Sequence, residues 1–198
     1  MLTIGVLALQ GAVQEHLDCL NALPDVTGVI VKKAADFDNI DALILPGGES
    51  TTMGKLLRQF DLTQVVTDKV QAGMPIWGTC AGMILLAKNV VGEEACHLGL
   101  MDISVQRNAY GSQLNSFITN LMIPSVSAAA IPLVFIRAPY VESAGSTVNI
   151  LATVDDKIVA VEEKNMLATA FHPELTGNLA FHSYFVEKVR SNNSSFSS

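Results

Sequence analysis

A cysteine between two glycines is the residue in this sequence best suited to covalent chemistry. Cys80 lies within Gly78-Thr-Cys-Ala-Gly82, between a strand-like run at 75–77 and good helix formers at 83–87. Glycines two positions before and after the cysteine permit a tight strand-to-helix turn, as in the nucleophile elbows of hydrolases. We expect an exposed thiol at a helix N-terminus, where backbone N–H groups stabilise a thiolate nucleophile. A small cysteine buried in a core turn is the alternative that this motif leaves open.

A histidine and a glutamate two residues apart supply the groups that such a nucleophile needs. His172 and Glu174 flank Pro173 directly after a strand-like run. Side chains two apart in an extended segment point to the same side, and we expect Pro173 to keep the segment extended. If this segment lies near Cys80, the three side chains form a nucleophile, a base and an orienting carboxylate. The other histidines are expected to be surface or core residues; these are His16, His97 and His182.

The elements that must position these groups alternate in the first half of the chain. Apolar runs at 3–9, 26–31 and 42–45 alternate with helical patterns at 13–23, 53–60 and 62–72. Continuous hydrophobicity in a strand is typical of a parallel sheet that helices cover on both faces. The sequence therefore predicts an α/β fold with a doubly wound, mostly parallel sheet flanked by helices.

Shorter strand patterns dominate the second half of the chain. They cover 101–106, 117–122, 133–136, 150–154, 158–162 and 166–171, and a polar link with Asn108, Gly111 and Asn115 joins the first two. The last three predict an antiparallel meander, a small embellishment of the main sheet. A final amphipathic helix is expected at 179–189. We expect one domain over 1–190 and a disordered polar tail at 191–198.

A pair of adjacent glycines follows the third predicted strand. Gly47 and Gly48 precede a helix for which Ser50 or Thr51 is available as N-cap. Their backbone N–H groups can approach a ligand or a developing anion closely, although an ordinary glycine turn is the alternative. At two other strand ends, Arg107 and Arg137 could each hold a carboxylate or be a solvated surface charge.

Composition excludes several classes of partner and site. A net charge of −7 and a pI near 4.9 argue against nucleic acid or an anionic membrane as a partner. Cys19, Cys80 and Cys96 show no CxxC spacing, which argues against a disulfide framework or a zinc site and indicates a cytoplasmic, reducing setting. The apolar segment at 2–9 is short for a membrane span and has no basic residue before it, so we expect a first strand and not a signal peptide. A second catalytic domain does not fit in 198 residues.

Three motifs, in this order, resemble the class I (triad) glutamine amidotransferase domain. They are Leu45-Pro-Gly-Gly-Glu-Ser-Thr-Thr, Gly78-Thr-Cys-Ala-Gly and Phe171-His-Pro-Glu. Further segments resemble the glutaminase subunit of pyridoxal 5'-phosphate synthase, the Pdx2 or PdxT family. These are Ile4-Gly-Val-Leu-Ala-Leu-Gln-Gly, His97-Leu-Gly, Arg107-Asn and Phe135-Ile-Arg-Ala-Pro. The resemblance covers the chain from Thr3 to about Val189.

The resemblance implies hydrolysis of L-glutamine without a cofactor or metal. Cys80 attacks the side-chain amide to give a γ-glutamyl thioester, His172 transfers protons, and Glu174 orients the imidazole. Backbone N–H groups of Gly48 and Ala81 form the oxyanion hole. The implied glutamine-binding positions are Gly48, Glu49, Ser50, Arg107, Ile136 and Arg137. Ammonia passes to a separate synthase subunit of the Pdx1/PdxS family, a (β/α)8 barrel.

Two other functions fit part of the sequence. A cysteine hydrolase of the DJ-1/PfpI type would share the scaffold, but such proteins usually have histidine directly after the nucleophile, where this chain has Ala81. The non-enzymatic alternative is a binding subunit that kept the fold without turnover.

The docking face of the synthase is expected around the active-site mouth. Ligand sites on doubly wound sheets lie at the carboxyl ends of the strands, where Gln10, Cys80 and His172 are all predicted to fall. A peptide between two glycines rotates at little steric cost. The peptide joining Gly47 and Gly48 is therefore a candidate switch that completes the oxyanion hole when the synthase docks.

Overall fold

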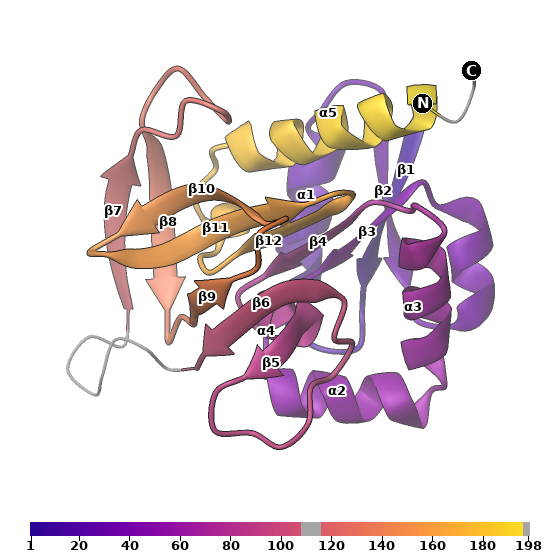
Figure 1. Cartoon of the computed structure of the whole chain (residues 1–198). Helices are drawn as coiled ribbons and strands as arrows, with labels where there is room; N and C mark the ends of the chain where they lie inside the picture. The colour runs from indigo at the N-terminus through magenta and orange to yellow at the C-terminus, as the bar shows by residue number, and fades with distance from the viewer. Residues whose placement is uncertain (108–115, 196–198) are drawn as a thin grey trace.

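A computed structural model describes residues 1–107 and 116–195 of the chain. Its strands are β1 (Leu2–Leu7), β2 (Val26–Val31), β3 (Ala42–Leu45), β4 (Ile76–Thr79), β5 (Ala87–Val90), β6 (Met101–Gln106), β7 (Ser116–Leu121), β8 (Ile131–Ile136), β9 (Tyr140–Ala144), β10 (Asn149–Val154), β11 (Lys157–Glu163) and β12 (Met166–Thr169). Within the described ranges, ten of them form one sheet in the order β2-β1-β3-β4-β12-β11-β9-β6-β5, with β10 beside β11. The β7–β8 hairpin forms a separate sheet, at the left of Figure 1.

Helices cover both faces of this sheet, as the sequence predicted. They are α1 (Val13–Asn21), α2 (Ser50–Gln59), α3 (Leu62–Gln71), α4 (Ala81–Leu86), α5 (Ala180–Ser195) and the 3-10 turns η1 (Ala34–Asn39) and η2 (Pro173–Leu175). Trp77 of β4 packs edge-on against His16 of α1 and His182 of α5, so these two helices share one face. Gly78 follows Trp77 and faces the backbone of α4. Successive residues of a strand face opposite sides, so α4 lies on the other face.

The parallel half of the sheet brings the ends of three buried strands together. The neighbouring pairs from β2 to β12 are all parallel. Every residue of β3, β4 and β12 is buried, which explains their continuous hydrophobicity. Leu45 pairs with Gly78, and Thr79 pairs with Thr169. The segments after these strands therefore emerge at the same edge of the sheet.

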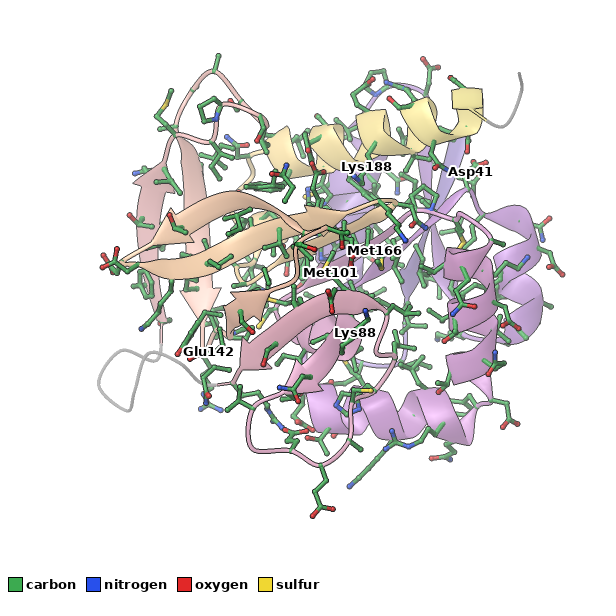
Figure 2. All side chains as sticks on the ribbon, in the orientation of Figure 1. Asp41, Lys88, Met101, Glu142, Met166 and Lys188 are labelled. Atoms are coloured by element: carbon green, nitrogen blue, oxygen red, sulfur yellow. The ribbon has the colours of Figure 1, made fainter. Side chains whose placement is uncertain are left out.

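The antiparallel part extends the central sheet. The predicted meander of β10, β11 and β12 is confirmed, and β9 joins it to β6. Lys188 of α5 lies over this region (Figure 2), where its Nζ donates to Glu162 Oε2 at 2.9 Å. The sequence missed β5 and β9. In β5 the two exposed residues Lys88 and Asn89 leave too short an apolar pattern to be recognised, and Ala87 was wrongly assigned to the preceding helix.

The C-terminal helix is longer than the sequence predicted. A disordered tail from residue 191 was expected, but α5 continues to Ser195. Asn192 Nδ2 donates to the Gly73 carbonyl at 3.0 Å, so a tertiary contact supports polar residues whose own helix propensity is modest. Residues 196–198 and the predicted link with Asn108, Gly111 and Asn115 lie outside the described residues. In the part of the chain that is described, none of the helices has the length and hydrophobicity that crossing a bilayer requires.

Candidate active site

Cys80 occupies a sharp turn between β4 and α4. Its backbone has φ 48° and ψ −102°, a conformation that strains a non-glycine residue and is typical of a nucleophile elbow. The Cys80 N–H donates to the Thr169 carbonyl at 2.8 Å and so ties the turn to β12. A Cβ atom on Gly78 would lie 2.4 Å from the backbone of Gly82, and one on Gly82 would lie 2.1 Å from the Leu45 carbonyl. Both glycines are therefore required by close backbone approach.

The thiol is less exposed than the sequence predicted. Cys80 is only 7% exposed, because the end of β8 and the imidazole of His172 lie against it. Its Sγ lies 3.9 Å from the Ile136 carbonyl oxygen. Cys19 is also buried, which raises the pKa of its thiol, whereas Cys96 is exposed. The Cys80 thiol interacts with the His172 imidazole, which can activate it.

His172 and Glu174 are paired, but not in the extended segment that was predicted. Pro173 begins η2, because its fixed φ suits the first position of a helical turn. Within this turn, His172 Nδ1 lies 2.7 Å from Glu174 Oε1. The His172 N–H donates to the Val134 carbonyl at 2.8 Å, which anchors the turn to β8. The predicted pairing is confirmed, and the predicted extended backbone is wrong.

Two opposing effects set the protonation of His172. Burial lowers its pKa, but interactions with Cys80 and Glu174 outweigh burial and raise the pKa to about 10. The imidazole is therefore protonated at neutral pH when it is paired with a thiolate. A thiolate beside an imidazolium is the reactive state of a cysteine nucleophile.

The loop after β3 approaches this pair from another side. A Cβ atom on Gly47 would lie 2.3 Å from His172 Cε1, so only glycine fits there. The Gly47 carbonyl accepts a hydrogen bond from the Ala12 N–H at 3.0 Å. Gln10 Oε1 accepts one from the Glu49 N–H at 2.8 Å. The segment after β1 therefore holds the glycine loop in place.

Glu49, not Ser50 or Thr51, caps α2. Its carboxylate accepts hydrogen bonds from the backbone N–H groups of Thr51 at 2.9 Å and Thr52 at 2.7 Å. A carboxylate has two oxygens and satisfies two unpaired donors of the helix end, which explains why it displaces a hydroxyl. The Thr52 hydroxyl, together with these N–H groups, lowers the pKa of Glu49 to about 2 despite some burial. The Ser50 hydroxyl is buried and has no hydrogen-bond partner among the described residues.

Arg107 and Arg137 reach the site from two different strand ends. The Arg107 guanidinium lies 3.5 Å from Glu49 Oε1 and also pairs with Glu93. Arg137 directly follows β8, is exposed and has φ 44°. Glu93 could not be recognised in the sequence, because only the fold brings it to Arg107.

One cavity of about 730 Å³ collects nearly all of the predicted site residues. Those that line it are Gly48, Glu49, Ser50, Cys80, Ala81, Arg107, Ile136, Arg137 and His172. Glu174 lies behind His172 and is 6% exposed. Ala81 is the first residue of α4, where backbone N–H groups lack an acceptor within the helix. Within the described residues, no group of three or more His, Cys, Asp or Glu side chains could hold a metal ion.

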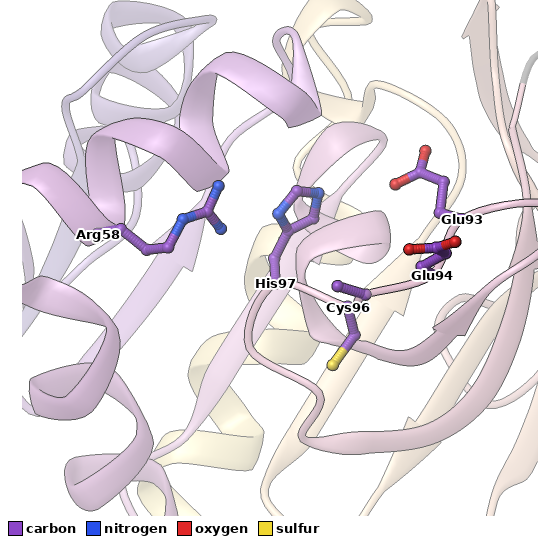
Figure 3. A pocket seen from close by; sticks show the side chains of 6 residues that line it. Arg58, Glu93, Glu94, Cys96 and His97 are labelled. Carbon is purple, nitrogen blue, oxygen red and sulfur yellow. The ribbon is translucent and has the colours of Figure 1, made fainter.

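A second cavity, of about 650 Å³, lies beyond Glu93 and is not part of this site. Figure 3 shows the His97 ring between Arg58 of α2 and the carboxylates of Glu93 and Glu94. A Cβ atom on Gly54 would lie 2.1 Å from His97 Nδ1, so the ring packs directly on α2. His97 thus packs the segment that carries Glu93 against α2, a structural role consistent with the surface or core position expected for this histidine.

The sequence also missed a contact of His16 with the site. His16 is completely buried on α1, and its Nε2 lies 3.5 Å from Glu174 Oε2. Its place beside Leu17 and Leu20 on the apolar face of the helix was the available signal, since an imidazole needs a polar partner there.

Comparisons with known proteins find similar chains over nearly the whole length of this one. A relative from Ruminiclostridium cellulolyticum, named pyridoxal 5'-phosphate synthase subunit PdxT, is 54% identical over 96% of this chain and 100% of its own length. A relative of the same name from Clostridium botulinum is 52% identical over 97% and 100%. A solved structure described as a glutamine amidotransferase matches with a TM-score of 0.89 at 41% identity, over 94% of this chain and 98% of that chain.

The likeness of fold extends further than the likeness of sequence. PurLQS from Thermotoga maritima matches with a TM-score of 0.68 at 16% identity over 100% of both chains, which shows a shared fold alone. The model of the SNO glutamine amidotransferase family matches residues 6–191. The resemblance predicted from the three motifs is confirmed: this chain belongs to the SNO glutamine amidotransferase family.

Proposed function

We propose that this chain hydrolyses L-glutamine at Cys80 and delivers the ammonia to a separate pyridoxal 5'-phosphate synthase subunit. The observation that carries the proposal is the contact of Cys80, on its strained elbow, with a His172 imidazole that is paired to Glu174 at 2.7 Å. The names of the similar proteins support the pathway. Family membership argues against a DJ-1/PfpI-type hydrolase.

The proposed reaction has two halves, the formation of a thioester and its hydrolysis, and each triad residue takes part in both. The Cys80 thiolate attacks the amide carbon of glutamine, and the His172 imidazolium protonates the departing nitrogen. The resulting γ-glutamyl thioester is hydrolysed by water that His172 deprotonates, while Glu174 keeps the imidazole oriented. Backbone N–H groups of Gly48 and Ala81 receive the oxyanion, and each contributes about 3 kcal/mol in the transition state.

Glutamine recognition is assigned to the outer wall of the cavity. The unpartnered Ser50 hydroxyl supports this, because a buried polar group without a partner is costly until a ligand binds it. Arg137 is exposed and available to a carboxylate. Arg107 is already held by Glu49 and Glu93, which fixes its guanidinium beside the cavity. Ile136 lines the cavity at the end of β8, directly before Arg137.

The acceptor of ammonia is assigned to a second protein, the synthase subunit of the Pdx1/PdxS family with a (β/α)8 barrel. The described part of this chain forms one α/β fold, and the cavity at Cys80 is lined by the residues assigned to glutamine hydrolysis. The site that consumes ammonia is therefore assigned to another chain. The cavity opens at the carboxyl ends of the strands, so docking there would place the ammonia next to the partner. The three free cysteines agree with a cytoplasmic setting.

The hydrogen bonds of the glycine loop support a docking-controlled oxyanion hole. The Gly47 carbonyl is held by the Ala12 N–H, so the Gly48 N–H of the same planar peptide points the opposite way. Rotation of this peptide must break that bond. Gln10 and Gly11 precede Ala12 and line the cavity mouth, where a docked synthase would contact them. Docking can thus shift the equilibrium between the two peptide orientations.

The experiment measures glutamate release at saturating glutamine with and without the synthase subunit. We expect turnover to rise strongly on adding the synthase and to vanish in Cys80→Ala. Gln10→Ala should reduce the stimulation without removing the basal rate, because it frees the Glu49 N–H from its acceptor. Gln14→Ala is the matched control, since Gln14 is exposed and its amide nitrogen donates to Asp18 of the same helix. Equal turnover with and without the synthase would contradict the switch, and turnover retained in Cys80→Ala would contradict the function.

A further inference from the structure

A closed polar cluster lies behind the triad, on the side away from the cavity. It contains His16 of α1, Thr79 of β4 and His182 of α5, all at 0% exposure. His16 Nδ1 lies 3.0 Å from His182 Nε2, and His16 Nε2 lies 3.2 Å from Thr79 Oγ1. The same Nε2 lies 3.5 Å from Glu174 Oε2, a buried oxygen that has no hydrogen-bond partner among the described residues. Thr79 and His182 thus both contact His16, and His16 in turn lies beside the Glu174 carboxylate.

Only one arrangement of protons satisfies this cluster. If His16 Nε2 carries the hydrogen, it donates toward Glu174 Oε2 and Thr79 Oγ1, and its Nδ1 accepts from His182 Nε2–H. The atom left over is then His182 Nδ1, whose lone pair has no hydrogen-bond partner within the described ranges. In the opposite arrangement, an N–H on His182 Nδ1 would be buried without an acceptor, and a lone pair of His16 would face the carboxylate. Both are unfavourable in a buried site.

The surroundings keep the two imidazoles neutral and rigid. Trp77 contacts both rings edge-on, with centroids at 5.7 Å from His16 and 5.0 Å from His182. Burial lowers the pKa of His16, and repulsion from His182 and His172 in their protonated forms lowers it further. Burial also lowers the pKa of His182, to about 4. The other titratable groups around Glu174 are His172 and Cys19. A neutral donor can fix a carboxylate in place without cancelling the charge that His172 requires.

We propose that His16, backed by His182, is a positioning residue of the glutaminase reaction, which fixes Glu174 by donating its Nε2–H toward Oε2. This inference rests on the proposed role of Glu174 in orienting His172. His16 does not line the cavity and touches no reacting atom. It contacts the carboxylate that orients His172. A chain of contacts therefore runs from Cys80 through His172, Glu174 and His16 to His182.

The test compares His16→Leu and His16→Gln with the control Phe185→Leu in the complex with the synthase. Phe185 packs on the same Trp77 at 5.6 Å, so its truncation loosens the same layer without touching the carboxylate. His16→Leu should lower kcat about tenfold to 100-fold, the loss expected for a hydrogen bond to a charged group, with KM nearly unchanged. His16→Gln should recover part of kcat, because its amide nitrogen can replace the Nε2–H donor.

The pH profile separates positioning from a structural role. With Glu174 loosened, the His172 imidazolium loses support, so the alkaline limb of kcat/KM should move to lower pH in His16→Leu and stay in place in Phe185→Leu. The inference is overturned if the two leucine variants lose kcat equally with unmoved profiles. If His16→Leu does not fold, His182→Leu replaces it. This variant should show the same shift of the alkaline limb to lower pH, with a smaller loss of kcat. A loss of kcat equal to that of Phe185→Leu, with an unmoved profile, would overturn the inference.

The same assay distinguishes this inference from the function beneath it. Glu174→Gln that leaves turnover unchanged would contradict the triad itself. Glu174→Gln that lowers turnover, beside a His16→Leu that does not, would overturn only the role of His16.

Discussion

The two sides of the cavity are built in opposite ways. On the catalytic side, Cys80, His172 and Glu174 are 7%, 8% and 6% exposed. Backbone hydrogen bonds to β12 and β8 hold the elbow and the histidine turn. On the proposed recognition side, Ile136 and Arg137 are exposed at the end of β8.

The difference shows which part of the site is finished before a ligand arrives. Buried, hydrogen-bonded groups are fixed in advance, which is what electrostatic stabilisation of a transition state requires. Exposed loop residues at a strand end are less constrained and can adjust to glutamine or to a partner. Substitutions on the catalytic side should therefore change kcat, and those on the recognition side should change KM.

The largest effect is expected from Cys80→Ala. Loss of the nucleophile should lower kcat by at least about 10⁴-fold, as for other covalent triads. The melting temperature should stay close to that of the wild type, because only one sulfur atom at the cavity wall is removed. Cys96→Ala, at an exposed cysteine, is the control that should keep full turnover. A modest loss in Cys80→Ala would mean that the catalytic side is not organised around this residue.

Glu174→Gln should have the next largest effect. The amide cannot stabilise an imidazolium as a carboxylate does, so kcat should fall by about 10³-fold to 10⁴-fold. KM should change little, because Glu174 touches His172 and does not line the cavity. Steady-state kinetics in the synthase complex measure both. A large rise in KM with kcat preserved would reverse the comparison of the two sides.

Arg107→Ala and Arg137→Ala should act on binding. Each removes a cation from the cavity wall and should raise KM about tenfold to 100-fold with a smaller change in kcat. Arg58→Ala is the matched control, because Arg58 lines the second cavity. An unchanged KM in both variants would contradict a role of these arginines in glutamine binding.

A smaller effect concerns acid stability. His182 has an ordinary pKa of 6.5 and a folded pKa of about 4, so the unfolded chain binds more protons between these values. The contribution of His182 to stability is complete above pH 6.5 and is lost as the pH falls toward 4. Denaturant titrations should show that His182→Gln flattens the decline of the unfolding free energy in this window. An equally steep decline in the variant would contradict the neutral, buried state of His182.

The structural features that the sequence predicted correctly are those that depend on local residue pattern and on spacing along the chain. Glycine spacing located the elbow, continuous hydrophobicity located β3 and β12, and the motifs singled out Cys80, His172 and Glu174, which the fold brings together. It failed where tertiary contacts decide. Glu49 caps α2 because its side chain folds back, and His16 meets Glu174 because α1 packs beside η2. The Glu49 cap leaves no periodic signal in the chain, and the place of His16 on the apolar face of α1 does not identify its partner.

Mapping the adduct of a glutamine-analogue electrophile tests the central claim most directly. The reagent carries the γ-carbonyl of glutamine and alkylates the nucleophile that attacks it, and peptide mass spectrometry identifies the modified residue. The account predicts one adduct per chain, on the peptide with Cys80, that glutamine suppresses and that Cys80→Ala abolishes. An adduct on Cys19 or Cys96, or labelling that persists in Cys80→Ala, would contradict it.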